Sequence, residues 1–165
     1  MTGARARAAA QGYISRPMAD DPDLDDVRRL ISGDHGLSVV SLARPDGSIS
    51  SSVVNIGVLP HPVGGAAVVG FVVRGSAYKR RRLRLEPRLT VTVRAGWEWR
   101  AVEGEAELIG PLDPHPTAAV DGPELLRAVF RAAGGTHSDW AEYDRVMADE
   151  QRTSVLVTPI RVYGN

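Results

Sequence analysis

The chain has 165 residues, of which 43% are hydrophobic and 24% are charged, and this suits one compact domain with a core large enough to fold unaided. Its 20 basic residues balance 20 acidic ones, so the chain as a whole offers no attraction to nucleic acid or to an anionic membrane, and any anion binding must be local. The absence of cysteine excludes disulfides, thiolate catalysis and cysteine-ligated metals, and it is compatible with the cytoplasm, where we expect the protein to reside.

The N-terminal residues differ in composition from the rest of the chain. Residues 1–17 contain three arginines, many alanines and no acid, a composition that transit peptides share. They lack the apolar core of a secretory signal, and no run in the chain approaches the roughly 18 apolar residues of a membrane span. We therefore expect a flexible tail over residues 1–18, one domain over residues 19–165 and no membrane span.

A short helix and a β-hairpin are the first elements that the sequence predicts. Carboxylates within residues 20–26 can cap a helix whose apolar residues recur at helical spacing up to Ser32, and Gly33 ends it. Residues 37–43 and 48–59 read as two strands, because an Arg-Pro-Asp-Gly turn separates them. The helix should cover one side of the core.

Two serines stand out on the second strand of this hairpin. Ser50 and Ser52 share one face, because side chains alternate along a strand. Their hydroxyls can line a polar pocket or face water, and by themselves the residues favour water, which is the more frequent outcome.

A loop and a buried strand come next. Residues 60–65 are rich in proline and glycine, and His61 between two prolines is more typical of an exposed loop histidine than of a metal ligand. Residues 66–73 are almost continuously apolar, as in a strand buried on both faces.

The stretch from Arg74 to Arg94 concentrates positive charge and holds Lys79, the single lysine of the sequence. Small residues lead from the preceding strand into a short basic helix, which ends at Glu86 because proline follows. The first turn of a helix presents free backbone N–H groups and a positive dipole end. With Lys79 and Arg82 one turn apart, the pattern predicts a seat for phosphate.

Two other interpretations of the basic stretch compete with the phosphate seat. Charge runs are most often solvated faces without a ligand. A nucleic-acid patch would need aromatic partners and a basic fold, whereas the net charge is zero and Tyr78 is the one aromatic residue among these charges. The phosphate seat requires a concave neighbour that the sequence does not demonstrate.

The middle of the chain predicts two more strands. Residues 89–93 continue the strand pattern, Ala95-Gly96 forms a turn, and residues 97–109 are long enough to bend around a barrel. Trp97 and Trp99 would share one face of that strand. Such a pair usually packs in a core or an interface, although a flat ring system could also stack on it.

Two helices and a closing strand are predicted for the last third. Residues 123–133 have proline in the first turn and a Gly-Gly pair at the end. Residues 136–139 can cap a second helix with one apolar stripe, and residues 152–163 alternate as a strand does.

No catalytic constellation is readable. The four histidines show no metal spacing, and there is no serine-nucleophile elbow. His137, Ser138 and Asp139 are consecutive at a helix start, where capping is more usual than a catalytic triad. Redox chemistry would therefore depend on a bound organic cofactor, and we nominate neither a catalytic residue nor a metal ligand.

Several short motifs together resemble one known superfamily. They lie at residues 75–79 (Gly-Ser-Ala-Tyr-Lys) continuing to Leu83, at 87–88 (Pro-Arg), at 96–97 (Gly-Trp) and at 102–106 (Val-Glu-Gly-Glu-Ala). Their order and spacing resemble the split β-barrel flavin and deazaflavin oxidoreductases, the pyridoxamine-phosphate-oxidase-like superfamily. Residues 135–143 and 161–164 resemble its deazaflavin-dependent branch, known mainly from actinobacteria. The resemblance covers about residues 37–165.

The resemblance implies a mainly β fold with flanking helices, a six-stranded antiparallel split β-barrel of the FMN-binding type. It also implies a homodimer with a cofactor groove at the dimer interface. The implied activity is hydride transfer from reduced coenzyme F420, an 8-hydroxy-5-deazaflavin, to a small organic substrate. The alternatives are an FMN-dependent oxidoreductase of the same fold and a non-catalytic deazaflavin-binding protein.

The resemblance also assigns cofactor-binding residues. Lys79 matches the lysine that contacts the cofactor phosphate, and Arg82 stands where relatives often carry asparagine. Relatives tend to have an arginine where this chain has Ala77, so Arg74 would supply that charge from the strand end. By the same resemblance, Ser50 and Ser52 match residues near the deazaflavin rings, and Trp97 matches a tryptophan at the groove. A groove rimmed by further arginines would favour the more acidic F420 over FMN; these are Arg80, Arg81, Arg84 and Arg88.

Overall fold

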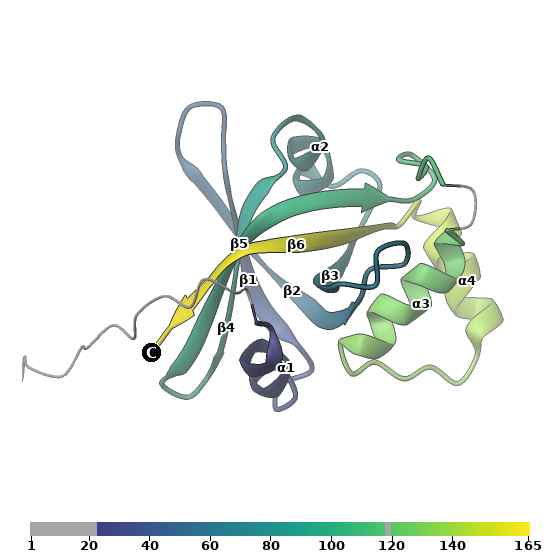
Figure 1. Ribbon diagram of the computed structural model, residues 1–165. Helices are drawn as coiled ribbons and strands as arrows, with labels where there is room; N and C mark the ends of the chain where they lie inside the picture. Colours follow the sequence, from purple (N-terminus) through teal and green to yellow (C-terminus); the bar gives the residue numbers. More distant parts are fainter. Residues whose placement is uncertain (1–22, 118–119) are drawn as a thin grey trace, which may run out of the picture.

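The computed structural model describes residues 23–117 and 120–165, and the predicted tail at residues 1–18 lies outside them (Figure 1). Within these residues the order of the elements is α1 (Asp25–Ile31), β1 (Leu37–Ala43), β2 (Ile49–Pro60), β3 (Ala67–Val73), α2 (Tyr78–Leu85), β4 (Arg88–Ala95), β5 (Glu98–Ile109), α3 (Gly122–Ala132), α4 (Trp140–Asp149) and β6 (Thr153–Gly164). Each strand and helix that the sequence predicts from residue 23 onward is present, with boundaries shifted by a few residues at most.

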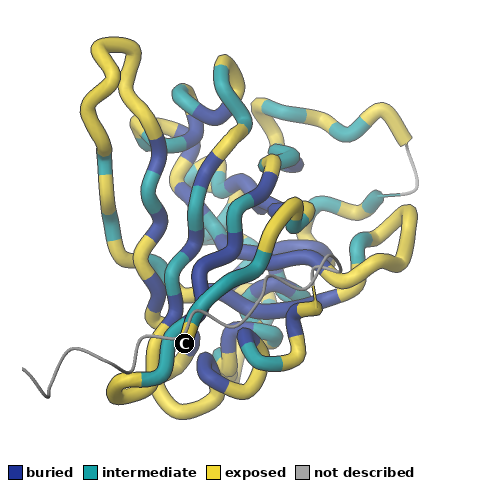
Figure 2. Tube along the Cα trace, turned by 60° about the vertical axis from the view of Figure 1, so that its left-hand side comes forward, coloured by how far each residue is buried: buried dark blue, intermediate teal, exposed yellow. Residues whose placement is uncertain are grey.

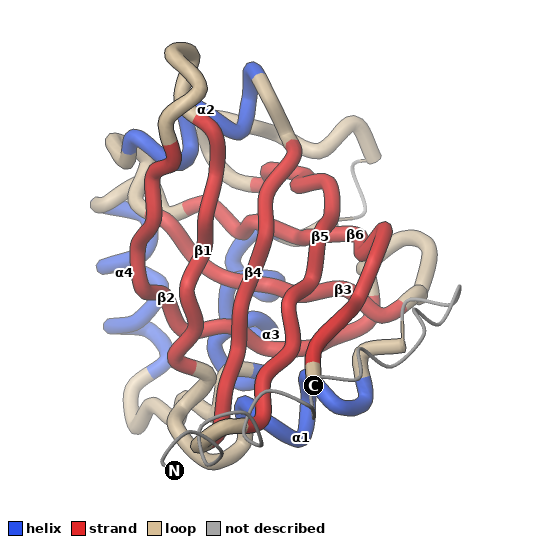
Figure 3. The backbone as a smooth tube through the Cα atoms, turned by 90° about the vertical axis from the view of Figure 1, so that its left-hand side faces the viewer, coloured by secondary structure: helices blue, strands red, loops and turns tan. Residues whose placement is uncertain are grey.

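The six strands form a closed antiparallel barrel in the order β1-β2-β3-β6-β5-β4 (Figure 3). The long strand β2 bends from one neighbour to another: its residues 49–55 pair with β1, and its residues 56–60 pair with β3. A register shift between Glu103 and Gly104 leaves Ile160 of β6 as an extra residue, as in a β-bulge. The predicted fold, a six-stranded antiparallel split β-barrel with flanking helices, is confirmed.

Alternate residues of β1 and β4 fill the barrel, whereas β3 and the first half of β6 are buried on both faces, as the burial pattern along the backbone shows (Figure 2). In β1, for example, Val40 and Leu42 are buried while Leu37 and Val39 are exposed. The centre is occupied by large side chains such as Phe71, which has no exposed surface. Burial of this apolar surface is the main term that holds the barrel together.

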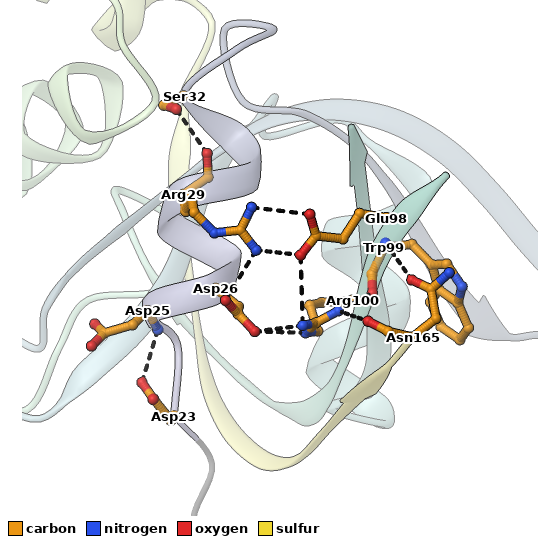
Figure 4. Close-up of polar contacts among 9 residues, drawn as sticks. All are labelled: Asp23, Asp25, Asp26, Arg29, Ser32, Glu98, Trp99, Arg100 and Asn165. Atoms are coloured by element: carbon orange, nitrogen blue, oxygen red, sulfur yellow. Dashed lines mark hydrogen bonds and ion pairs between the residues drawn. The ribbon is translucent and has the colours of Figure 1, made fainter. Parts of the chain in front are cut away.

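Helix α1 closes one end of the barrel. Its Val27 and Leu30 are buried in the barrel core, and its polar face meets β5 through an ion-pair network (Figure 4). Asp26 accepts a hydrogen bond from Arg100 Nε at 3.1 Å, and Arg29 pairs with Glu98. The side chain of Arg100 is only 11% exposed, so this network satisfies a charge that the barrel end covers.

Helix α3 lies against β2 and β3, and α4 lies beside α3 (Figure 1). Leu125 and Val129 of α3 share a second apolar cluster with Leu59 of β2. Caps fix both helices, since the side chains of Asp121 and Asp139 accept hydrogen bonds from backbone N–H groups of the first turns. Helix α2 lies at the end of the barrel opposite α1 (Figure 3).

Candidate functional site

A pocket of about 490 Å³ opens where β2 and β3 separate. Pairing between these strands ends at Ile56 and Phe71; beyond it β2 continues beside β1, and β3 continues beside β6. Val54 lines one side of the opening and Val72 the other. The concave neighbour that a phosphate seat requires is therefore present beside the basic turn.

The start of α2 forms the cationic side of the pocket. Ser76, Ala77 and Lys79 line it, together with Arg74. Ala77 is the N-cap residue and makes no side-chain cap, so the first backbone N–H groups of α2 keep their hydrogen-bonding capacity. These amides, the positive end of the helix dipole and the adjacent cations together suit an anion.

Lys79 is half-buried, and burial lowers the pKa of its ammonium group. Within residues 23–117 and 120–165 it has no hydrogen-bond or ion-pair partner, whereas Arg74 pairs with Glu150 at 3.2 Å. A partly desolvated cation without a counterion gains more from an anionic ligand than one already paired.

Sequence reasoning missed a second cationic contribution, from the junction between α4 and β6. Arg152 lines the pocket and donates from Nε to Glu150 Oε2 at 2.6 Å. Val73 pairs with Thr153 across β3 and β6, which brings Arg74 next to Arg152. Since 77 positions of the sequence separate these arginines, only the strand order could have predicted the contact.

The junction and the basic turn touch directly. Gly75 donates a backbone hydrogen bond to the carbonyl of Glu150 at 3.2 Å, and a Cβ at Gly75 would lie 2.8 Å from the Gln151 backbone oxygen. A larger residue would therefore push the turn away from the junction. The glycine at this position allows both cationic segments to line one pocket.

Another part of the pocket lining is aromatic. Phe130 of α3 and Tyr143 of α4 line it with ring centroids 5.0 Å apart, and Met147 extends the same surface. The Tyr143 hydroxyl donates to the Leu126 carbonyl at 3.2 Å, and burial raises its pKa, so the ring is held in place as a neutral group. An anion at one side and a flat apolar group at the other would both be accommodated.

The predicted site residues are only partly brought together. Arg74 and Lys79 line the pocket, as described above. Ser50 and Ser52 are half-buried and follow the same face of β2 as Val54, but they lie beyond the residues that line the pocket. At about 3.3 Å per residue, Ser52 is about 7 Å further along the strand than Val54.

Arg82 and Trp97 lie outside this pocket. Arg82 donates from Nε to the carbonyl of Ala43 at 2.7 Å, at the end of β1. Trp97 is 94% exposed in the turn before β5, so the prediction that it shares a strand face with Trp99 is wrong. That turn lies at the α1 end of the barrel, and α2 lies at the other (Figure 3).

The expected rim of arginines is mostly engaged in other contacts. Arg80 is buried and donates from Nε to Asp113 Oδ2 at 2.6 Å, and Arg84 pairs with the second oxygen of Asp113 at 3.2 Å. Arg81 donates to the Ser76 carbonyl, and Arg88 lies 3.6 Å from Glu105. Arg80 anchors α2 and is not available to a ligand, which weakens the argument from arginine excess for the more acidic cofactor.

Other polar clusters are small. Glu107 accepts contacts from His61 at 2.7 Å and from His115 at 3.1 Å, away from the pocket. In the described part of the chain, no three His, Cys, Asp or Glu side chains are arranged to hold a metal ion. No helix in that part is long and apolar enough to cross a membrane.

Solved structures with the same architecture were found, although no model of a known protein family matches the chain. A conserved hypothetical protein of Mycobacterium tuberculosis has 16% identity and a TM-score of 0.62, over 89% of this chain and 87% of that one. An F420 reductase has 15% identity and a TM-score of 0.52, over 76% and 87%.

A third structure belongs to the pyridoxamine 5′-phosphate oxidase-related proteins. It is an FMN-binding protein from Nostoc punctiforme, with 11% identity and a TM-score of 0.57, over 88% of this chain and 84% of that one. At such identities the likeness concerns the fold. The chain thus shares the six-stranded split β-barrel fold of these structures, the fold that the sequence predicts.

Proposed function

We propose that the protein is an F420H2-dependent reductase that transfers a hydride to a small organic substrate. The observation that carries the proposal is the pocket between β2 and β3, in which the half-buried Lys79 and the start of α2 face an aromatic wall. Its donor set fits a phosphate group: an ammonium, two guanidinium groups and uncapped backbone amides.

The residues of this chain would bind and orient the cofactor. Lys79 and Arg74 would hold its phosphate, and Phe130 and Met147 would offer apolar contact to the rest of the molecule. Ser50 and Ser52, further along β2, would lie toward the rings. When bound, the deazaflavin supplies the hydride chemistry, so the protein contributes orientation and exclusion of water.

We further propose that the protein works as a homodimer. A row of cross-strand neighbours runs over the outer face of the barrel: Val53, Val39, Thr92, Ala101 and Tyr163. Val53 is 64% exposed and Val39 39%. A second copy would remove this apolar surface from water. Trp97 could reach a cofactor only as a residue of the partner subunit, since its own chain places it at the far end of the barrel.

Titration with oxidised F420, followed by the fluorescence polarisation of the deazaflavin ring, tests the proposal. Binding at micromolar protein is expected, and a flat titration would rule the function out. Lys79→Ala should weaken binding, while the matched variant Arg94→Ala, which removes an exposed cation at the end of β4, should not.

The FMN-dependent alternative keeps the same pocket, because an FMN phosphate needs the same cations. It predicts yellow protein on purification, or tighter binding of FMN than of F420. A non-catalytic carrier would bind F420 yet give no turnover with any electron acceptor and F420H2.

A further inference from the structure

Glu150 lies between the two arginines that face the pocket. Its Oε1 is 3.2 Å from Arg74 Nη2, and its Oε2 accepts hydrogen bonds from Arg152 at 2.6 Å. Each oxygen of one carboxylate is thus occupied by a different guanidinium group. This is the arrangement in which an oxyanion of a ligand would bind two arginines.

The backbone around Glu150 is held in place, so only the side chain can move away from the two arginines. The Glu150 carbonyl accepts from Gly75 N, and Gln151 adopts a left-handed backbone conformation with φ of 49° that ends α4. The side chain itself is 31% exposed, and that of Arg74 is 62% exposed. A rotation of the Glu150 side chain toward water would release both arginines without moving the turn that carries Lys79.

We propose that Glu150 is a built-in competitor for the anionic group of the ligand and that Arg152 is the third cation of the site. The inference rests on the proposed function and names the residue that sets which anions the site accepts. In the free protein the carboxylate offsets the repulsion among Arg74, Lys79 and Arg152. A ligand must displace it, and an intramolecular carboxylate acts at a high effective concentration.

The consequence is selectivity for phosphate. A simple monocarboxylate offers the arginines no more than Glu150 already does, whereas a phosphate presents more acceptor oxygens and also reaches Lys79, which has no acidic partner among the described residues. Glu150 could instead be a clamp that orients both arginines for the ligand. In that case removal of its charge would weaken ligand binding, whereas removal of a competitor strengthens it.

The test compares Glu150→Gln with the matched control Glu142→Gln, which removes an exposed carboxylate from the first turn of α4, where it pairs with Arg145. Three probes are titrated at fixed ionic strength: oxidised F420 by fluorescence polarisation, and inorganic pyrophosphate and acetate by calorimetry. Releasing partly exposed ion pairs should tighten binding in Glu150→Gln by about two- to fivefold, with no change in Glu142→Gln. The affinity for acetate should increase in Glu150→Gln by at least the same factor as the affinity for pyrophosphate.

Arg152→Gln should weaken the binding of F420 and of pyrophosphate about fivefold or more, because a charged contact is lost. Circular dichroism must show that each variant is folded. Unchanged or weaker binding by Glu150→Gln would overturn the competitor role, and so would the absence of pyrophosphate binding to every form. A further outcome is that pyrophosphate binds most tightly to Glu150→Gln and most weakly to Arg152→Gln while F420 and FMN bind to no form of the protein. In that case the proposed cofactor is wrong and the role of Glu150 stands.

Discussion

The ion pair between Arg80 and Asp113 makes the position of the basic turn testable through stability. The two side chains are 6% and 9% exposed, and Arg80 also donates to the carbonyls of Leu112 and Gly75. Asp113→Asn leaves a buried guanidinium without its counterion, and breaking such a pair costs about 3–5 kcal/mol. Because Arg80 holds both α2 and Gly75, the same change should loosen the pocket.

The assay is urea unfolding followed by circular dichroism. Arg84→Ala provides the control, since Arg84 contacts the same aspartate but is 56% exposed, and its loss should cost about 1 kcal/mol or less. The double variant Arg80→Met, Asp113→Leu should recover most of the lost stability, because apolar pairs can replace buried ion pairs. If Asp113→Asn is no more destabilising than Arg84→Ala, the pair does not anchor α2 as we argue.

Three further predictions concern charge and assembly. Burial lowers the pKa of Lys79 below its ordinary 10.5, so the affinity for pyrophosphate should fall as the pH rises toward that value. Lys79→Arg should make this decline shallower, because arginine stays protonated. If the affinity of both proteins depends on pH in the same way, Lys79 is not the group responsible. Hydrogen bonds from Arg100 and then Arg29 lower the pKa of Asp26 from 3.8, so the resulting stability is complete above that pH and is lost as the pH falls through the lowered value. Acid unfolding of Arg100→Met should therefore lose less stability below pH 3.8 than the parent does; an identical acid profile would count against this contribution. Val53→Glu should shift the protein to monomer in analytical ultracentrifugation, whereas Val63→Glu, in a loop, should not; a dimer in both variants would locate the interface elsewhere.

The sequence predicts the elements well because local signals mark their ends. The turn at residues 44–47, the proline after Glu86 and the cap at residues 136–139 act within a few residues, and the structure has them as expected. The six-stranded split barrel was predictable from the order of several motifs rather than from any single residue. The basic turn was predictable because small residues before the helix and the proline after it are local signals.

Contacts between distant segments explain what sequence reasoning could not supply. Arg80 looks like a surface cation of a charged helix, and only the loop carrying Asp113 makes it a buried anchor. Glu150 and Arg152 carry no local signal, and they join the site because β6 closes the barrel next to β3. Trp97 was predicted to be a strand residue because the sequence suggests a turn at Ala95-Gly96, whereas in the structure the turn includes Trp97 and β5 begins at Glu98.

The most direct test of the central claim is the affinity of oxidised F420 for the protein and for Lys79→Ala, measured side by side by fluorescence polarisation. The pocket predicts binding by the parent protein, and loss of the charged hydrogen bond should weaken it by about 1–3 kcal/mol, roughly five- to 150-fold. Equal affinity of the two proteins for F420 would show that the pocket at Lys79 is not its phosphate site.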